Sequence, residues 1–387
     1  MTRPEQVKID EFYFGLVLND HERALKEVAE FVREYPKNLD LLNTFADDAS
    51  ALMRFDIAED AEHRLLGTPP FRKSSTESVL ALWNEQLARN EFPSAAGTAK
   101  QARDDIPDLF QGPYLEVISF LAEGNIDKGE AEISHLREQQ LAQASLWLGG
   151  LLDTYKGRLA AAQRQWTEYL GIVQDTSETW VASEDVAHLW LARICLLAGD
   201  AEAARKHLNQ VQKVRDEYLA EAGKYYARLG DTQHAEDILG RLKSHLAGRA
   251  TNQNRAIIQL VEGEIELKKG NARKSFELIS TAAQYPWAYS FIPIKESLAN
   301  AALSSGHYDI AVSAYQEIVD KRGFAFSWDR PDDWIMAQYG LGHATDLQNR
   351  RDLAPQYYKE FEYLWHEGDH NLTPLREARK RISELAH

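Results

Sequence analysis

The chain has 387 residues, of which 44% are hydrophobic and 27% are charged, and its formal net charge is −16 at pH 7. This composition is that of an ordinary globular protein, and the negative charge argues against general nucleic-acid binding and against docking on anionic membranes. One cysteine, Cys195, excludes an internal disulfide and lies in an apolar helical run, where we expect a buried thiol.

The sequence predicts no membrane insertion. No run of 18 apolar residues occurs, which is about the length that a transmembrane helix needs. Charged residues interrupt every apolar run within residues 1–30, so we also expect no signal peptide.

A short pattern recurs ten times along the chain, in which a turn residue is followed five positions later by a small residue. The turn residues are Asn19, Met53, Asn90, Gly124, Gly157, Gly199, Gly230, Gly270, Gly306 and Asn349. The small residues are Ala24, Ala58, Ala95, Gly129, Ala162, Ala204, Ala235, Ser275, Ala311 and Ala354. Successive turn residues lie 31 to 43 positions apart, and a period in this range is typical of a helical-repeat solenoid.

Each copy of the pattern predicts a helical hairpin. Gly or Asn at the turn can adopt the left-handed backbone conformation that ends a helix, and the small residue allows the two helices to cross closely. A second small residue precedes the turn by seven positions, and it is Gly150, Ala192, Gly223, Gly263, Ala299 or Gly342. Because Gly inside a helix costs about 1 kcal/mol relative to Ala, this register indicates helix–helix contact. We therefore expect an all-α, right-handed solenoid of about ten hairpins.

In chain order, the pattern predicts three parts of one continuous solenoid. Residues 1–140 contain divergent repeats, and the first hairpin ends near Pro36, which stops a helix. Residues 141–372 contain regular repeats, with an insertion at 174–185 and an unusually apolar loop at 323–333. Residues 373–387 are expected to form an amphipathic capping helix that hides the last apolar face.

The small residues at these two sites, with an apolar residue twelve positions after the turn, resemble the tetratricopeptide repeat over nearly the whole chain. The stretches 318–323 and 357–361 also resemble parts of the C-terminal tetratricopeptide arrays of bacterial serine/threonine kinases and winged-helix regulators. The resemblance implies a bacterial signalling role, either as a sensor region of a longer protein or as a stand-alone relative. It implies a cytoplasmic location, or an extracytoplasmic one within a membrane-anchored regulator. The chain contains no kinase signature.

The resemblance also implies a binding groove on the concave side. In the family, the residue six positions before the turn faces that side, and here it is Arg193, Lys224, Glu264, Asn300 or His343. The register places Trp147 and Tyr339 on the same side. Because packing does not need a polar row, we expect a non-enzymatic scaffold that binds an internal segment of a partner protein there. Arg193 and Tyr339 are expected to contribute most. We expect no cofactor.

An enzymatic interpretation is the least favoured. Residues 366–370 match the His-Glu-x-x-His motif of zinc proteases, but that chemistry needs both His on one face of a continuous helix. Gly368, Asp369 and Pro374 predict a helix break instead, so we expect neither a metal site nor a catalytic residue.

Overall fold

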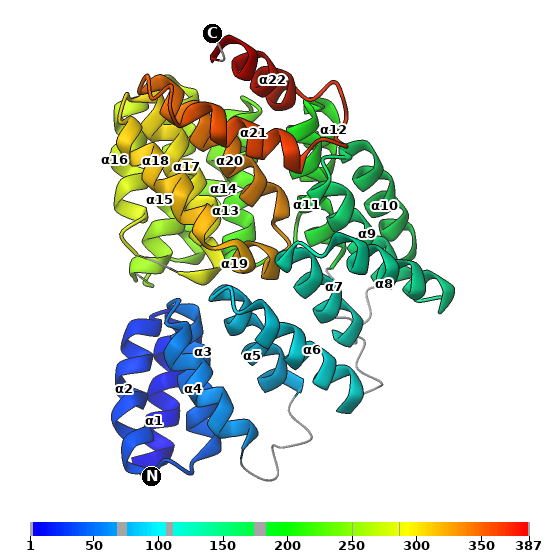
Figure 1. Cartoon of the computed structure of the whole chain (residues 1–387). Coiled ribbons are helices and arrows are strands. Elements are labelled where there is room, and N and C mark those ends of the chain that lie inside the picture. The colour runs from blue at the N-terminus through cyan, green and yellow to red at the C-terminus, as the bar shows by residue number, and fades with distance from the viewer. Residues whose placement is uncertain are drawn as a thin grey trace.

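A computed structural model describes residues 3–67, 76–105, 111–173, 183–249, 251–285 and 287–385, and every regular element within them is helical. The ten hairpins consist of α1 (Arg3–Phe12) and η1 (Tyr13–Val17) with α2 (His21–Glu34), α3 (Leu39–Ala51) with α4 (Phe55–Leu66), α5 (Thr76–Ala88) with α6 (Phe92–Asp105), α7 (Gln111–Glu123) with α8 (Ile126–Glu138), α9 (Ala142–Tyr155) with α10 (Leu159–Ile172), α11 (Glu184–Ala198) with α12 (Ala201–Leu208), α13 (Asp216–Arg228) with α14 (Thr232–His245), α15 (Asn252–Lys268) with α16 (Ala272–Ala282), α17 (Phe291–Ser304) with α18 (Tyr308–Asp320), and α20 (Pro331–Leu347) with α21 (Ala354–Leu364). The predicted all-α solenoid is therefore confirmed (Figure 1).

All ten turn residues adopt the left-handed backbone conformation. The six glycines have φ between 72° and 94°, and Asn19, Met53, Asn90 and Asn349 have φ between 58° and 61°. This conformation ends one helix, and at nine of the ten turns the next helix begins two residues later; after Asn349 it begins at Ala354. At several turns an aspartate then caps the second helix; Asp231, for example, accepts a hydrogen bond from the main-chain nitrogen of His234.

The small residues lie where the two helices of a hairpin cross. A Cβ atom added to Gly263 on α15 would lie 2.3 Å from Cγ1 of Ile279 on α16, and one added to Gly150 on α9 would lie 2.3 Å from Nε1 of Trp166 on α10. Glycine is required at these points because no side chain fits between the helices. The core inside each hairpin is correspondingly dense, and Trp166 is fully buried.

The C-terminal hairpins fold back on the middle of the chain. The short helix α19 (Arg322–Ser327), between α18 and α20, contacts α5 and α7, and α20 contacts α9. In Figure 1, α19 faces these N-terminal and central helices. The stretch 323–333 was expected to be a loop, but it forms α19 and the first turn of α20, and Phe324 and Phe326 are buried. The loop was predicted because six helical residues are too few to show a periodic pattern.

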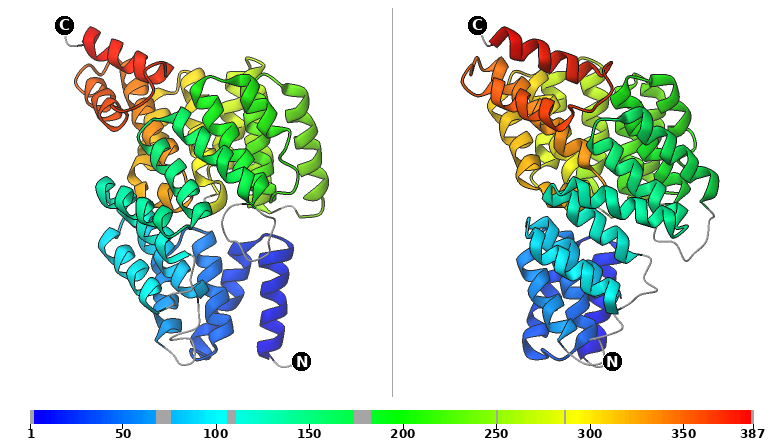
Figure 2. Two further views of the ribbon diagram at one scale, coloured as in Figure 1. Left: turned by 90° about the vertical axis from the view of Figure 1, so that its right-hand side faces the viewer. Right: turned by 45° about the vertical axis from the view of Figure 1, so that its right-hand side comes forward.

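Two further contacts join distant repeats. The main-chain nitrogen of Asp369 donates to the oxygen of Gly157 at 3.0 Å, and the Asp369 carboxylate accepts from the nitrogen of Ala160, in the first turn of α10, at 2.9 Å. Near the other end, Asn254 at the start of α15 donates to the main-chain oxygen of Leu18 at 3.2 Å. The two termini nevertheless lie at opposite ends of the molecule (Figure 2).

Helix α22 (Thr373–Leu385) packs against α21 and buries Leu375 and Ala378. The short helix η3 (Ala288–Ser290) leads into α17 and contacts α3. Among the described helices, none combines the length and the apolar character that a membrane span requires.

Candidate binding surface on the inner helices

The seven residues that the sequence suggested for a groove lie on the first helices of six hairpins, and the structure places them in three groups. Trp147 and Arg193 contact the segment between α19 and α20, Lys224 and Glu264 belong to a buried ionic network, and Asn300, Tyr339 and His343 remain partly exposed. The surface formed by these first helices is called the inner face below.

Asp329 is the point at which three inner helices converge. Its carboxylate accepts hydrogen bonds from the Tyr114 hydroxyl at 2.7 Å and from Nε1 of Trp147 at 3.1 Å. Its main-chain oxygen accepts from Nε1 of Trp190 at 3.2 Å and from the Arg193 guanidinium at 2.8 Å. The four donors lie on α7, α9 and α11, so one residue links three successive repeats.

The surroundings of Asp329 control its ionisation. Burial raises the pKa of its carboxyl group to about 6, although the hydrogen bonds from Tyr114 and Trp147 act in the opposite direction. Burial and the Asp329 charge together raise the pKa of Tyr114 well above its usual range. The Tyr114 hydroxyl therefore keeps its proton and remains a donor at all physiological pH values.

A group of buried charges surrounds this contact. Arg193 forms an ion pair with Asp332 at 3.0 Å, and Arg330 pairs with Glu221 on α13 and with Asp333 at 2.8 Å. Burial opposes ionisation of Glu221, but the charges of Arg330 and then Lys224 lower its pKa to about 2. The inner face thus provides both donors and acceptors to the segment that follows α19.

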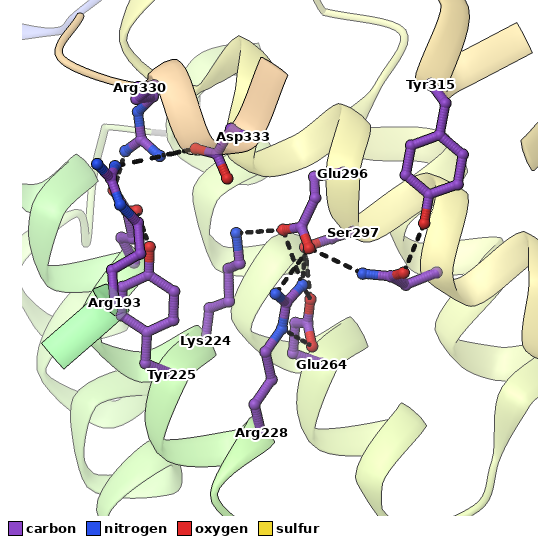
Figure 3. Close-up of polar contacts among 12 residues, drawn as sticks. Arg193, Lys224, Tyr225, Arg228, Glu264, Glu296, Ser297, Tyr315, Arg330 and Asp333 are labelled. Atoms are coloured by element: carbon purple, nitrogen blue, oxygen red, sulfur yellow. Dashed lines mark hydrogen bonds and ion pairs between the residues drawn. The ribbon is translucent and has the colours of Figure 1, made fainter. Parts of the chain in front are cut away.

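A second network joins α13, α15 and α17 (Figure 3). The Arg228 guanidinium binds Glu264 at 2.7 Å and Glu296 at 2.8 Å, and the Lys224 ammonium binds Glu296 at 2.6 Å. Ser297 donates a hydrogen bond to Glu264 at 2.5 Å. Two cations balance two carboxylates, so Lys224 and Glu264 are already paired within the chain and serve to hold three inner helices together.

The remaining suggested residues are more accessible. Asn300 donates to Glu296 at 2.9 Å and accepts from the Tyr315 hydroxyl at 2.8 Å. Tyr339 donates to Glu377 of α22 at 2.5 Å and stacks on the imidazole of His343, with 6.3 Å between the ring centroids. Asn300, Tyr339 and His343 are each partly exposed.

The residues of the zinc-protease motif do not lie on one continuous helix. Helix α21 ends at Leu364, so residues 366–370 lie beyond a helix. Glu367 is engaged in ion pairs with Lys156 at 3.5 Å and Arg158 at 3.3 Å. Within the part of the chain that the structure describes, no group of three or more His, Cys, Asp or Glu side chains could hold a metal ion.

Cys195 and the imidazoles of His188 and His207 are partly or fully buried and contact other residues of the chain. Nδ1 of His188 lies 2.9 Å from Nδ1 of His207, and burial lowers the pKa of both imidazoles, that of His207 to about 4. One neutral ring therefore donates to the other, which ties α11 to α12. Burial raises the pKa of the Cys195 thiol to about 12, so this thiol is a poor nucleophile at neutral pH.

Asp329 and Arg330 were not predicted as members of this surface, because they lie outside the repeat register. The only signal available was the run of aromatic residues at 324–328, which is unusual for a loop.

No protein-family model matches the sequence, and no curated protein matches it either. Among solved structures, the chain is similar to the Cut9–Hcn1 hetero-tetramer of APC/C, with a TM-score of 0.46 and 14% identity over 95% of this chain and 74% of that one. It is similar to yeast Tom70 (TM-score 0.41, 11% identity, 98% and 95% covered) and to the P58(IPK) TPR domain (TM-score 0.27, 15% identity, 99% and 98% covered). These likenesses are loose, and the class of the protein rests on its own hairpins: an all-α solenoid of tetratricopeptide-like repeats.

Proposed function

We propose that the chain is a non-enzymatic scaffold that binds a segment of a partner protein along its inner face. The observation that carries the proposal is the set of four donors, on α7, α9 and α11, that hold the carboxylate and the main-chain oxygen of Asp329. An inner face that binds a polypeptide of its own chain has the donors and the shape to bind another.

The partner contacts are assigned to the residues of the inner face that solvent reaches. Asn300, Tyr339 and His343 offer an amide, a hydroxyl and an imidazole on α17 and α20, and these groups can bond to the main chain of an extended segment. The buried Lys224 supports this surface through its ion pair with Glu296, which accepts a hydrogen bond from Asn300. An internal segment of a partner fits better than a free C-terminus, because the buried cations are already neutralised by carboxylates of the chain itself.

Site-specific photo-cross-linking tests the proposal. A photoreactive amino acid is introduced at Asn300 or His343 and, as a control, at the exposed position Asp237 on the outer helix α14. We expect both inner positions to cross-link to the same protein in cells and the outer position not to do so. Cross-linking of a partner only from the outer position would refute an inner-face scaffold.

A regulatory role is the second candidate, and the resemblance of 318–323 to bacterial kinase and regulator arrays favours it. That stretch forms the end of α18 and the start of α19, so it leads directly into the segment that fills the inner face. A kinase or winged-helix segment encoded in the same reading frame would support this role, and a frame that encodes neither would remove it.

A further inference from the structure

We infer that residues 327–333 are held as an internal ligand, and that the surface they cover on α7, α9, α11 and α13 is a binding site for a protein segment of the same chemistry. That chemistry is a carboxylate in a tight turn, followed directly by a guanidinium group and preceded by aromatic side chains. The inference goes beyond the proposed scaffold function, because it concerns a part of the inner face other than Asn300, Tyr339 and His343, and it states the chemistry of a segment that competes there with the chain's own segment.

The internal segment is complete as a structural unit. Asp329 has a left-handed backbone with φ of 54°. Its nitrogen donates to the oxygen of Phe326 at 3.0 Å, and the nitrogen of Arg330 donates to that of Ala325 at 2.9 Å. These bonds are the usual termination of a helix by a left-handed residue. The end of α19 therefore satisfies its own main chain and leaves the carboxylate and the oxygen of Asp329 free to face the inner helices.

The inner face complements this turn in charge. Donors surround the two acceptor groups of Asp329, as described above, and the Glu221 carboxylate on α13 accepts from the Arg330 guanidinium. The same guanidinium lies 5.4 Å from the ring centroid of Trp190, a cation–π distance. Acidic and basic groups of the segment thus meet opposite partners on adjacent helices, which is the arrangement that gives an interface its specificity.

Two aromatic side chains that precede the segment pack against two different helices. The ring centroid of Phe326 lies 5.7 Å from that of Tyr155 on α9, and the centroid of Phe324 lies 5.8 Å from that of Phe55 on α4. Both phenylalanines are 1% exposed. A ligand that uses both anchors therefore carries aromatic residues at the positions of Phe324 and Phe326, before its carboxylate, and also contacts Phe55 of α4.

The hairpins do not need the segment in order to stack. Helices of successive repeats contact each other directly, α9 through α10 with α11 and α13 with α15, and such nearest-neighbour contacts supply the stability of a solenoid. Removing the side chains of Asp329 and Arg330 should consequently weaken the hold of the inner face on the segment. It leaves the Glu221 carboxylate without its Arg330 partner and so lowers the stability, while the contacts between successive repeats remain.

A synthetic peptide with the sequence of residues 322–333 tests the inference. It is labelled with a fluorophore and titrated against the wild-type chain, the Asp329→Ala, Arg330→Ala double variant and an Arg273→Ala, Glu277→Ala control on the outer face. We expect the double variant to bind the peptide, and the wild type and the control to bind it at least about tenfold more weakly because their site is filled. A double variant that keeps its helical circular dichroism and its elution volume yet does not bind the peptide would overturn the inference.

If the double variant does not fold, Asp329→Asn provides the test, because it keeps the size of the side chain. Two peptides then compete for this variant, one with Asp and one with Asn at position 329. We expect the Asp peptide to bind about tenfold more tightly, and equal binding of the two would contradict a site that recognises a carboxylate. The result is independent of cross-linking at Asn300 and His343, so a failure here is distinguishable from a failure of the scaffold function.

Discussion

The guanidinium group of Arg193 donates a 2.8 Å hydrogen bond to the main-chain oxygen of Asp329, although 136 residues separate the two. A solenoid is stabilised mainly by contacts between successive repeats. The bond between Arg193 and Asp329 instead joins the sixth hairpin to the segment before the tenth. The inner face therefore consists of the first helices of the hairpins together with the segment around Asp329 that packs on them.

Replacing Arg193 by Ala should be strongly destabilising. The change removes the bond to Asp329 and the ion pair with Asp332, whose side chain is 1% exposed. Removing one partner of a buried ion pair typically costs about 3–5 kcal/mol. Arg273→Ala is the matched control, because the Arg273–Glu277 pair is exposed and contributes at most about 0.5 kcal/mol. Urea unfolding measures both, and equal midpoints for the two variants would contradict the buried position of Arg193.

Replacing Gly263 by Leu should lower the free energy of unfolding by about 1–3 kcal/mol through overpacking. Its added atoms would meet Ile279, to which even a Cβ atom comes within 2.3 Å. Gly240→Ala on α14 is the control, since beyond its chain neighbours and the nearby backbone of its own helix nothing lies within 4 Å of its Cβ position, and it should stabilise the helix by about 0.5–1 kcal/mol. Thermal unfolding should show a lower midpoint for Gly263→Leu and a higher midpoint for Gly240→Ala. An unchanged midpoint for Gly263→Leu would show that the predicted crossing point is misplaced.

The hairpins could be predicted because each depends on residues close in sequence. Asn90 and Gly157 adopt the left-handed conformation for the same local reason, and their neighbours five positions later are small because two adjacent helices cross there. Repetition made this weak local signal strong. The partners of Asp329 could not be predicted in this way, because no periodic pattern relates α19 to helices that precede it by more than 100 residues.

For the inner-face residues too, the position on a helix could be predicted from the sequence, but the bonding partner could not. The register correctly identified Trp147 and Lys224 as residues of first helices, and both lie among the inner helices. What a polar side chain on that face bonds to depends on chain folding beyond the repeat. Arg193 meets Asp329, and Lys224 meets Glu296, two hairpins further along. Their roles as partner contacts stay predictions.

The stability of the N-terminal repeats should fall as pH rises above neutrality. Burial raises the pKa of Glu62 on α4 to about 8, and burial together with the Glu62 charge raises that of Glu85 on α5 to about 9, from an ordinary value of 4.5. The folded chain then holds protons that the unfolded chain has released, so the free energy of unfolding decreases with pH up to these pKa values.

The range from about pH 7.5 to 8.5 suits this measurement, because burial also raises the pKa values of Glu11 and Asp332 to about 7, and these two groups titrate mainly below it. Glu221, with a pKa lowered to about 2, changes stability only below its ordinary value of 4.5. Glu85→Gln mimics the protonated side chain and should reduce the pH dependence measured by urea unfolding. A variant whose unfolding depends on pH as steeply as that of the wild type would show that Glu85 is ionised in the fold.

The double variant His366→Ala, His370→Ala should keep its stability within about 0.5 kcal/mol, because both imidazoles are exposed and lie beyond α21. Asp369 lies between the two histidines in the sequence, and Asp369→Ala should, in contrast to the histidine variant, lower the stability. It removes the acceptor for the Ala160 nitrogen at the start of α10 and should cost about 0.5–2 kcal/mol, as the loss of a helix cap does. Stoichiometric zinc in the wild-type chain that is lost from the histidine variant would overturn this expectation.

A double-mutant cycle between Tyr114 and Asp329 tests most directly whether the inner helices hold the segment that follows α19. Tyr114→Phe removes one donor and Asp329→Asn alters its acceptor, and urea unfolding gives the free energies of the wild type, the single variants and the double variant. We predict a coupling energy of about 0.5–3 kcal/mol, whereas Tyr114→Phe combined with the distant Asp237→Asn should be additive within about 0.5 kcal/mol. Additive effects of Tyr114→Phe and Asp329→Asn would contradict an inner face that binds its own chain.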